Sequence, residues 1–287
     1  MRDSISRCPA LRRIAALAAL LLLAATSCSR REELPIGVVL VCEPDAPAGS
    51  FDREQLIQEL DERLNGRPPR RALVRADGAA RIEVAVVGYD ESRARWVERQ
   101  LAVVEPLELR LLANPQRDAS LLDEAGRFAP AAPGDARPPA QWVEVAEPFA
   151  DEVREHPDLM WRESEGHVLE VLVLNDPHDV ATANIERVWD AVDDLGRPCV
   201  QVVLDEPGAD AMAALLAQSD SNQPSRRLLG AIVEGRLRTL PLTDGVRHER
   251  AWIVGNFSDN EVHDLVHLLR LGPPACPLRI VARRSGE

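Results

Sequence analysis

The sequence contains no lysine, because all 34 basic residues among its 287 are arginine. This absence excludes sites that need a lysine side chain, such as the phosphate-binding P-loop, a Schiff base or a serine–lysine dyad. Aromatic residues make up only 3% of the chain, so a stacking surface for nucleotide bases is not expected. The formal net charge of −13 argues against nucleic acid as a partner and against a membrane surface held by basic patches.

The rest of the composition is that of a globular protein. Hydrophobic residues account for 45% of the chain and charged residues for 28%, which are ordinary values for folded domains. A length of 287 residues is enough for two domains that each bury a hydrophobic core. We therefore expect a folded chain of more than one unit.

Residues 1–28 are organised like the signal peptide of a bacterial lipoprotein. A basic first segment is followed by an apolar run over residues 14–25 and by small residues that lead to Cys28. The run has twelve residues, whereas a helix that spans a membrane needs roughly 20. In this interpretation Cys28 is lipidated and becomes the first residue of the mature chain. The alternative is an ordinary export signal, cleaved nearby, in which Cys28 has no role.

A lipid on Cys28 would decide where the protein works. No later stretch approaches about 18 consecutive apolar residues, so no spanning helix is expected beyond the signal peptide. Several acyl chains together hold a protein stably on a membrane, which a single chain does not. The sequence thus predicts a protein on the periplasmic side of the cell envelope that is anchored to the membrane by lipid.

Three cysteines, Cys42, Cys199 and Cys276, lie beyond the predicted signal peptide. Their wide separations do not match the spacing of zinc ligands. An exported protein can form disulfides, but an odd number leaves at least one thiol free or paired with another chain. Cys199 falls within an apolar run and is expected in the core.

Residues 35–113 predict a ferredoxin-like βαββαβ unit, here called the base. Asp77-Gly78 is a strong hairpin signal, and Asp52 with Gln55 has the spacing of a helix cap. The expected order is strand, helix, strand, strand, helix, strand, over residues 36–41, 52–66, 71–76, 81–87, 90–101 and 107–112. A connection over residues 114–141 follows. Its segment 129–140, APAAPGDARPPA, suits neither a helix nor a central strand, and marks either a domain boundary or an insertion.

Residues 142–283 predict a second α+β subdomain with antiparallel strands, here called the head, and a closing helix and strand. Ser258 with Glu261 forms a capping box before an amphipathic helix that ends at Gly272. Between 180 and 196 the apolar spacing fits a helix, while the alternation over 186–192 equally fits a strand. The other expected elements are strands at 168–174, 199–204, 228–233, 237–242, 251–254 and 278–281, and a helix at 207–217. The fold class predicted for the whole chain is therefore α+β.

One short motif suggests metal chemistry. His263-Asp264-x-x-His267 places two histidines one turn apart on a helix, as in zinc proteases. However, Asp264 stands where such proteases have the glutamate base, and no third ligand is suitably spaced. We interpret the motif as a solvated helix face, and a metal hydrolase stays the weaker alternative.

The remaining candidates for chemistry have structural explanations. The carboxylate pairs Asp193-Asp194 and Asp205-Glu206 lie beside glycine or proline at the ends of elements, where acidic residues form turns and begin helices. His156, His167 and His178 show no partner pattern. We therefore expect no catalytic, metal-binding or cofactor-binding residue, and no enzymatic activity.

Several segments are similar to those of one family. Residues 227–237, RLLGAIVEGRL, with Leu240-Pro241 after them, are similar to a hairpin that reads LAIVLDGKVxSAPxI. Residues 253–265, IVGNFSDNEVHDL, resemble IxGxFTxEEANDL, and residues 268–278 resemble LLRAGxLPAPL. Residues 196–204 and 107–112 resemble a GxPxVxFxL strand and an LEFRLV strand. All of these belong to SecD, the accessory subunit of the bacterial protein-export translocase.

The resemblance covers about residues 35–282 and corresponds to the first periplasmic domain of SecD, with its base and head. It implies a strand over 186–193, and contact with Sec translocase subunits or exported preproteins through backbone edges and apolar grooves of the head, roughly 142–250. The sequence departs from the family at a shorter hairpin near Glu234-Gly235 and at His267, which replaces an apolar residue. The transmembrane helices that conduct protons in the family have no counterpart in the sequence, so proton-driven work is not implied. The alternative function is a structural or interaction lipoprotein that kept the fold without a role in translocation.

Overall fold

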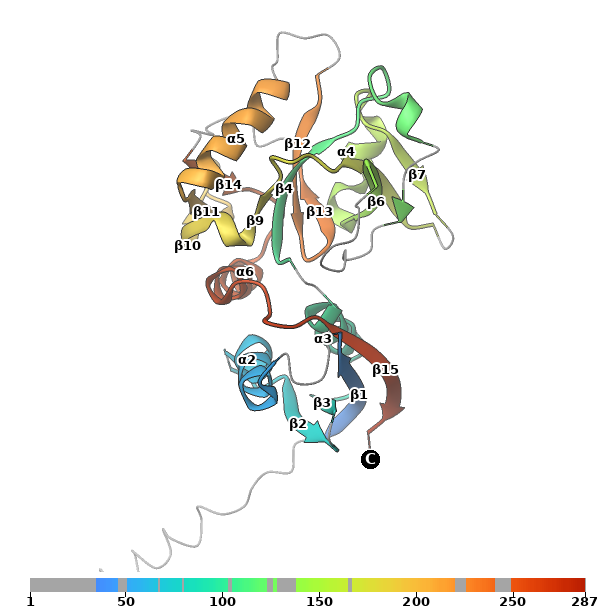
Figure 1. Cartoon of the computed structure of the whole chain (residues 1–287), viewed down its shortest axis with the longest axis vertical. Coiled ribbons are helices and arrows are strands. Elements are labelled where there is room, and N and C mark those ends of the chain that lie inside the picture. Colours follow the sequence, from blue (N-terminus) through green and yellow to red (C-terminus); the bar gives the residue numbers. More distant parts are fainter. Residues whose placement is uncertain are drawn as a thin grey trace, which may run out of the picture. The chain divides into compact units, whose positions relative to one another are not determined.

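The computed structural model describes residues 35–45, 51–66, 68–78, 80–102, 105–122, 126–127, 138–164, 167–219, 226–240 and 249–286. The predicted signal peptide with Cys28, and residues 129–137 of the proline- and alanine-rich stretch, lie outside these residues. The described chain combines helices with largely antiparallel sheets, which confirms the α+β class (Figure 1). Within it, no helix is both long and apolar enough to cross a membrane.

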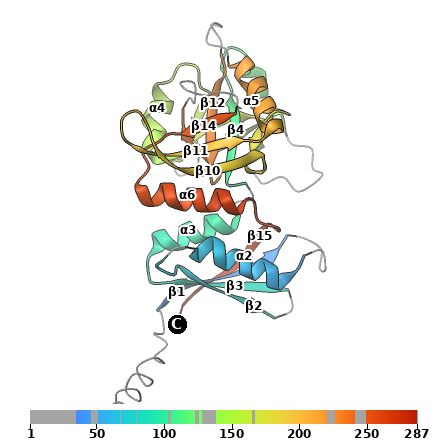
Figure 2. The ribbon, with the colours of Figure 1, turned by 90° about the vertical axis from the view of Figure 1, so that its left-hand side faces the viewer.

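The base contains the first and the last described strands. Its elements are β1 (Ile36–Pro44), α2 (Arg53–Asn65), β2 (Ala72–Asp77), β3 (Arg81–Val87), α3 (Glu91–Ala102) and β15 (Leu278–Ser285). The strands form a sheet in the order β15-β1-β3-β2, in which each neighbouring pair is antiparallel. Both helices pack on one face of this sheet (Figure 2), through apolar residues at helical spacing that include Leu56, Leu60 and Leu64 of α2 and Ala94, Val97 and Leu101 of α3.

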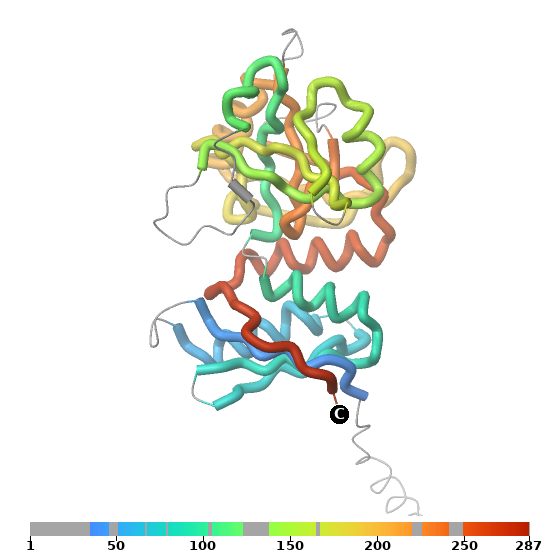
Figure 3. Tube along the Cα trace, turned by 90° about the vertical axis from the view of Figure 1, so that its right-hand side faces the viewer, coloured from blue at the N-terminus to red at the C-terminus, as the bar shows by residue number. Residues whose placement is uncertain are grey.

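The prediction that residues 107–112 complete the base sheet is wrong. They form β4 (Leu107–Leu112), which pairs with strands of the head, and β15 takes the place beside β1. The first and last described strands therefore lie side by side (Figure 3). The two strands exchange places because β15 buries only one of its faces, whereas β4 buries both. In β15, Leu278 and Ile280 pack on the base core while Arg279 is exposed, whereas every residue of β4 is buried.

In the head, part of the described chain closes into a ring of strands. The elements of this part are β4, β5 (Gly126–Arg127), β6 (Ala140–Val145), α4 (Ala150–Glu155), β7 (Trp161–Glu163), β8 (Leu169–Leu174), β9 (Val180–Ala181), β12 (Leu228–Val233), β13 (Arg236–Thr239) and 3-10 turns at Ala119–Leu121, Glu147–Phe149 and Thr182–Asn184. Strands β6, β13, β12, β4 and β8 pair in that order, and β8 pairs back with β6. Leu112, Val143 and Ile232 share the core of the ring. Alternate residues of the same strands, such as Leu111 and Leu229, pack in a second core outside it.

A separate sheet, here called the outer sheet, packs on that second core. It contains β10 (Ile185–Val192), β11 (Pro198–Leu204) and β14 (Arg250–Ile253), in the antiparallel order β10-β11-β14. The helices α5 (Glu206–Gln218) and α6 (Asp259–Leu271) contribute apolar residues to the same core. Residues 185–192 are thus a strand, as the resemblance to SecD implies, and not the helix that the apolar spacing also allowed.

Local signals in the sequence are present in the structure. The side chain of Asp52 accepts hydrogen bonds from the backbone N–H groups of Glu54 and Gln55 at the start of α2. Ser258 and Glu261 form the predicted capping box of α6. Gly78, in the turn between β2 and β3, has a positive φ of 64°, which glycine adopts without strain.

Helix α6 contacts both the base and the outer sheet (Figure 2). Toward the base, Asp264 forms an ion pair with Arg71 at 2.7 Å, and a ring nitrogen of His267 lies 3.0 Å from the carbonyl oxygen of Glu62. Toward the outer sheet, Arg270 donates to the carbonyl oxygen of Val188 at 3.1 Å. The polar face of α6 is thus only partly solvated, because His263 and Arg270 are exposed while Asp264 and His267 contact the base.

A buried ionic cluster lies beside β4. The side chain of Arg110 is fully buried and donates to the carbonyl oxygen of Leu174, and it forms ion pairs with Glu108 at 3.3 Å and Asp179 at 3.2 Å. Burial raises the pKa of Asp179 to about 6, although the nearby Arg110 opposes the rise. One carboxylate oxygen of Asp179, Oδ1, has no hydrogen-bond partner among the described residues. The free-energy cost of removing this carboxylate from water is therefore larger than the stabilisation that its partners provide.

We predict that Asp179→Asn removes a pH-dependent loss of stability. The folded protein holds this proton more tightly than the unfolded chain, in which the pKa is near 3.8, so the contribution of Asp179 is most favourable below that value and is lost as the pH rises to about 6. The expected size is at most about 3 kcal/mol. Urea unfolding from about pH 4 to pH 7 measures it. Asp151→Asn, at a side chain that is 95% exposed, is the control. Parallel pH curves for the wild type and Asp179→Asn would contradict the prediction.

Candidate functional site

The face of the outer sheet that points away from the core carries two tryptophans. The register places Trp189 of β10 opposite Gln201 of β11, and Gln201 opposite Trp252 of β14. Because side chains alternate along a strand, these three residues share the face opposite to Val202 and Ile253, which pack in the core. All three are partly exposed. Two aromatic side chains therefore flank an amide on an accessible antiparallel surface.

The two margins of the outer sheet are open within the described chain, since β10 and β14 each pair only with β11. The hairpin geometry shows which groups of β10 face outward. Asp193 donates its backbone N–H to the carbonyl oxygen of Arg197 on the facing strand. Alternation then directs the N–H and C=O groups of Val188, Asp190 and Val192 away from β11. Arg270 occupies the carbonyl of Val188, so the backbone at residues 190 and 192 forms the open part of the edge.

The β10–β11 hairpin presents apolar side chains next to this edge. Val192 is 68% exposed and Leu195 is 76% exposed. The turn that carries them is held by Asp193, whose carboxylate accepts hydrogen bonds from the backbone N–H groups of Leu195 and Arg197. The hydrogen bonds from Arg197 and Leu195 keep the pKa of Asp193 below its ordinary value, so the turn stays fixed at neutral pH. Backbone hydrogen-bonding groups and exposed aliphatic side chains thus lie next to each other at this end of β10, on the strand that also carries Trp189.

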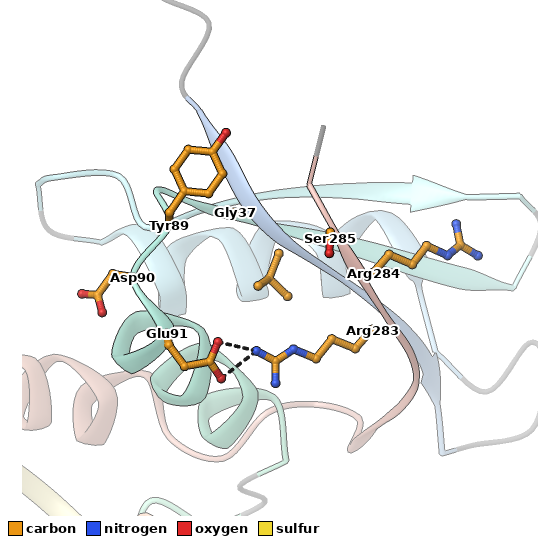
Figure 4. Close-up of a pocket in the computed structure, with 8 residues that line it drawn as sticks. Gly37, Tyr89, Asp90, Glu91, Arg283, Arg284 and Ser285 are labelled. Carbon is orange, nitrogen blue, oxygen red and sulfur yellow. Dashed lines mark hydrogen bonds and ion pairs between the residues drawn. The ribbon is translucent and has the colours of Figure 1, made fainter.

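A pocket of about 430 Å³ lies in the base, where β1 begins, α3 begins and β15 ends (Figure 4). Arg283 spans it and donates to both carboxylate oxygens of Glu91, at 2.7 and 2.8 Å. The hydrogen bond from Arg283 lowers the pKa of Glu91, and hydrogen bonds from Ser92 lower that of Asp90. Both carboxyl groups therefore stay ionised at neutral pH, which does not suit a general acid.

The two histidines of the predicted helix motif are directed to different partners. The Nδ1 atom of His263 lies 2.6 Å from the carbonyl oxygen of Asp259 within α6, and its Nε2 atom lies 3.9 Å from the carboxylate of Asp190. His267 contacts α2 of the base instead. In the part of the chain that the structure describes, no group of at least three histidine, cysteine or acidic side chains is placed to hold a metal ion.

The other polar candidates have local contacts. Asp193 fixes the β10–β11 turn, and Asp205 caps α5 by accepting a hydrogen bond from the backbone of Gly208. The Nδ1 atom of His156 lies 3.3 Å from the backbone nitrogen of Asp158. His167 lies 3.9 Å from Glu163, and the backbone of His178 donates to Asp176. These contacts organise turns and helix ends, as interpreted from the sequence for the acidic pairs.

The sequence alone did not identify the tryptophan face. Trp189 and Trp252 are 63 positions apart and come together only through the pairing of both strands with β11. The alternation around Val188 contained part of the signal, because it places Trp189 on the face opposite to the core. The second tryptophan could be added only once the strand order was known.

No protein-family model matches the chain, and no curated protein matches it. Among solved structures it is similar to SecDF. One, described as a membrane component that enhances protein export, matches over 86% of this chain and 99% of its own, at 19% identity and a TM-score of 0.49. SecDF in a super-membrane-facing form and the translocon-associated SecDF of Thermus thermophilus each match over 94% of this chain, at 18% and 19% identity and TM-scores of 0.47 and 0.37. The chain spans 34% and 35% of their lengths. These structures belong to the family that the sequence motifs resemble.

The three described cysteines are free and buried. Cys199 lies on β11, where alternation places it on the same face as Gln201, and Cys42 and Cys276 lie in the base core. Burial raises the pKa of all three thiols, that of Cys42 to about 12. Because the thiolate is the reactive form, none of the three is poised for redox or nucleophilic chemistry.

We predict that Cys42, Cys199 and Cys276 resist thiol reagents in the folded protein and react rapidly once it unfolds. Burial keeps the reagent away, and the raised pKa values keep the thiols protonated. A time course of iodoacetamide labelling with and without urea, read by peptide mass spectrometry, distinguishes the three positions. Fast labelling of any of them without urea would contradict the burial described here.

Proposed function

We propose that this protein is an accessory of Sec-dependent protein export, which binds extended segments of exported polypeptides on the outer sheet. The observation that carries the proposal is the open edge of β10 beside the tryptophan face. The export context comes from the resemblance of residues 227–278 to SecD. The role is binding and not catalysis.

The outer sheet suits a partner that arrives as an extended chain. A strand added along β10 would pair with the backbone groups of Asp190 and Val192, which do not depend on the partner's side chains. Trp189, Leu195 and Val192 would supply apolar contact beside that strand. A surface that combines backbone hydrogen bonds with adaptable apolar contact can accept many sequences, as a protein that assists export must.

The proposed anchor is a lipid on Cys28, at the end of the predicted signal peptide. Between Cys28 and Ile36, where β1 begins, an extended chain spans at most about 29 Å. A tether of that length would keep the base close to the membrane on the periplasmic side. Polypeptides that leave the translocase would then meet the protein at high local concentration.

We predict that a photo-crosslinking amino acid at Leu195 captures exported polypeptides in living cells, whereas one at Tyr89 does not. The two side chains are equally accessible, at 76% and 77% exposure, but Leu195 borders the outer sheet and Tyr89 lies in the base. Captured chains are identified by mass spectrometry while export is in progress. Recovery of resident envelope proteins alone would support the alternative, an interaction lipoprotein without an export role.

We predict that Asp190→Pro reduces capture at position 195 about tenfold, because proline removes the outward N–H and blocks strand addition. The pairing of β10 with β11 does not use that group and is retained. Asp190→Ala is the matched control, since it removes the same carboxylate and keeps the N–H. Equal capture by both variants, with circular dichroism unchanged, would show that strand addition is not the mode of binding.

A further inference from the structure

A group of charged side chains with more arginines than carboxylates lies where α3 meets the turn between β12 and β13. The side chain of Gln100 donates to Glu234 at the tip of this hairpin, which places the end of α3 against it. Arg236 forms an ion pair with Glu144 at 2.8 Å, and the guanidinium of Arg238 lies 3.9 Å from the other carboxylate oxygen of Glu234. Arg99, beside Gln100 on α3, adds a further guanidinium to this group.

Arg99 is the member of the group without a partner. It is partly buried, and no acidic side chain of the described chain lies within ion-pair distance of it. Burial lowers the pKa of Arg99, and the charge of Arg236 lowers it further. In addition, the Nε atom of Arg238 is buried without a hydrogen-bond partner among the described residues. Glu234 and Glu144 compensate this charge only in part, because they already pair with Arg238 and Arg236. The site therefore holds an excess of positive charge and an unused donor.

Other buried or partly buried arginines of the described chain differ in this respect. Arg110, which is fully buried, bonds to two carboxylates and a backbone carbonyl. Arg227 donates to both carboxylate oxygens of Asp118, at 2.5 and 3.1 Å. Arg63 donates to the carbonyl oxygen of Gly272 at 2.6 Å. Each of these three arginines thus donates to at least one acceptor of the chain. Arg99 differs from them, because the described chain gives it no acceptor.

We propose that Arg99, Arg236 and Arg238 form a binding site for an oxyanion, a carboxylate or a phosphate, that another molecule presents. A guanidinium offers a planar pair of N–H donors that matches the two oxygens of such a group. An anion there would accept from Arg99 and from Nε of Arg238, and would offset the repulsion between Arg99 and Arg236. On a chain with a net charge of −13, this local excess of positive charge would select where an anionic partner binds.

The test measures stabilisation of the full chain by inorganic phosphate and by succinate, against sodium chloride at equal ionic strength. A ligand that binds only the folded state raises the melting temperature in proportion to its concentration and affinity. We expect at least one of the two anions to stabilise the wild type beyond chloride. Stabilisation by phosphate alone points to a phosphorylated ligand or a lipid headgroup, and stabilisation by succinate points to acidic side chains of a polypeptide.

Arg99→Gln should weaken the anion effect about tenfold or more, as expected for loss of one charge-assisted hydrogen bond. Arg95→Gln is the matched control, because Arg95 lies one turn earlier on α3 and pairs with Glu91 at the exposed surface. Without added anion, Arg99→Gln should melt at or above the wild-type temperature, since it removes an unpaired charge. If Arg99→Gln does not fold, Arg99→Lys is the second variant. It keeps the positive charge but lacks the planar pair of N–H donors, and it should show an intermediate anion effect.

The proposal is overturned if neither anion stabilises the wild type beyond chloride. It is also overturned if Arg99→Gln responds like Arg95→Gln, or if Arg99→Gln melts well below the wild type without added anion. This last result would mean that Arg99 makes a contact the folded chain needs. These outcomes do not depend on peptide capture by the outer sheet, so the two proposals succeed or fail separately.

Discussion

The pairing of β1 with β15 is the constraint on which the arrangement of the described chain depends. It joins residues 38–44 to residues 278–285, so the base sheet is completed by a segment more than 230 positions away. Everything between α3 and β15 must therefore leave the base and return to it. Helix α6 makes that return, and its contacts with Arg71, Glu62 and Val188 connect the base core with the outer sheet. The head is in this sense an insertion into the base.

How far the sequence could predict this fold differs between local and long-range features. Asp52, Ser258 with Glu261, and Gly78 marked helix starts and a turn, because these residues act on the backbone next to them. Which strands pair with each other was harder to predict. Residues 107–112 carry Glu108 and Arg110 between leucines, as a half-exposed edge strand would, yet both charged residues are buried in an ionic cluster with Asp179. Charged residues that alternate with leucines indicate an exposed face only where no buried side chain can pair with them. Here the pairing side chain, Asp179, lies on another segment of the chain.

The candidate site shows the same limit. The open edge of β10 was predicted only as an unspecified backbone edge of the head, while its position follows from the turn at Asp193 and from Arg270 on α6. Exposed edges invite aggregation, and charged residues along them reduce that risk. Glu186 and Asp190 lie on β10 itself, and Arg270 covers one of its carbonyl groups. The edge is thus partly protected and leaves a short open stretch next to Val192, where a second chain could pair without general self-association.

The position of β15 also affects how the chain folds as it is made. Synthesis delivers residues in order, so β1, α2, β2, β3 and α3 emerge long before the strand that completes their sheet. Until residues 278–285 arrive, one side of β1 has no partner and the base core lacks Leu278 and Ile280. The ring and the outer sheet, whose strands all lie between residues 107 and 253, contain their partners within themselves. Vectorial folding would therefore begin in the middle of the chain and end at its first element.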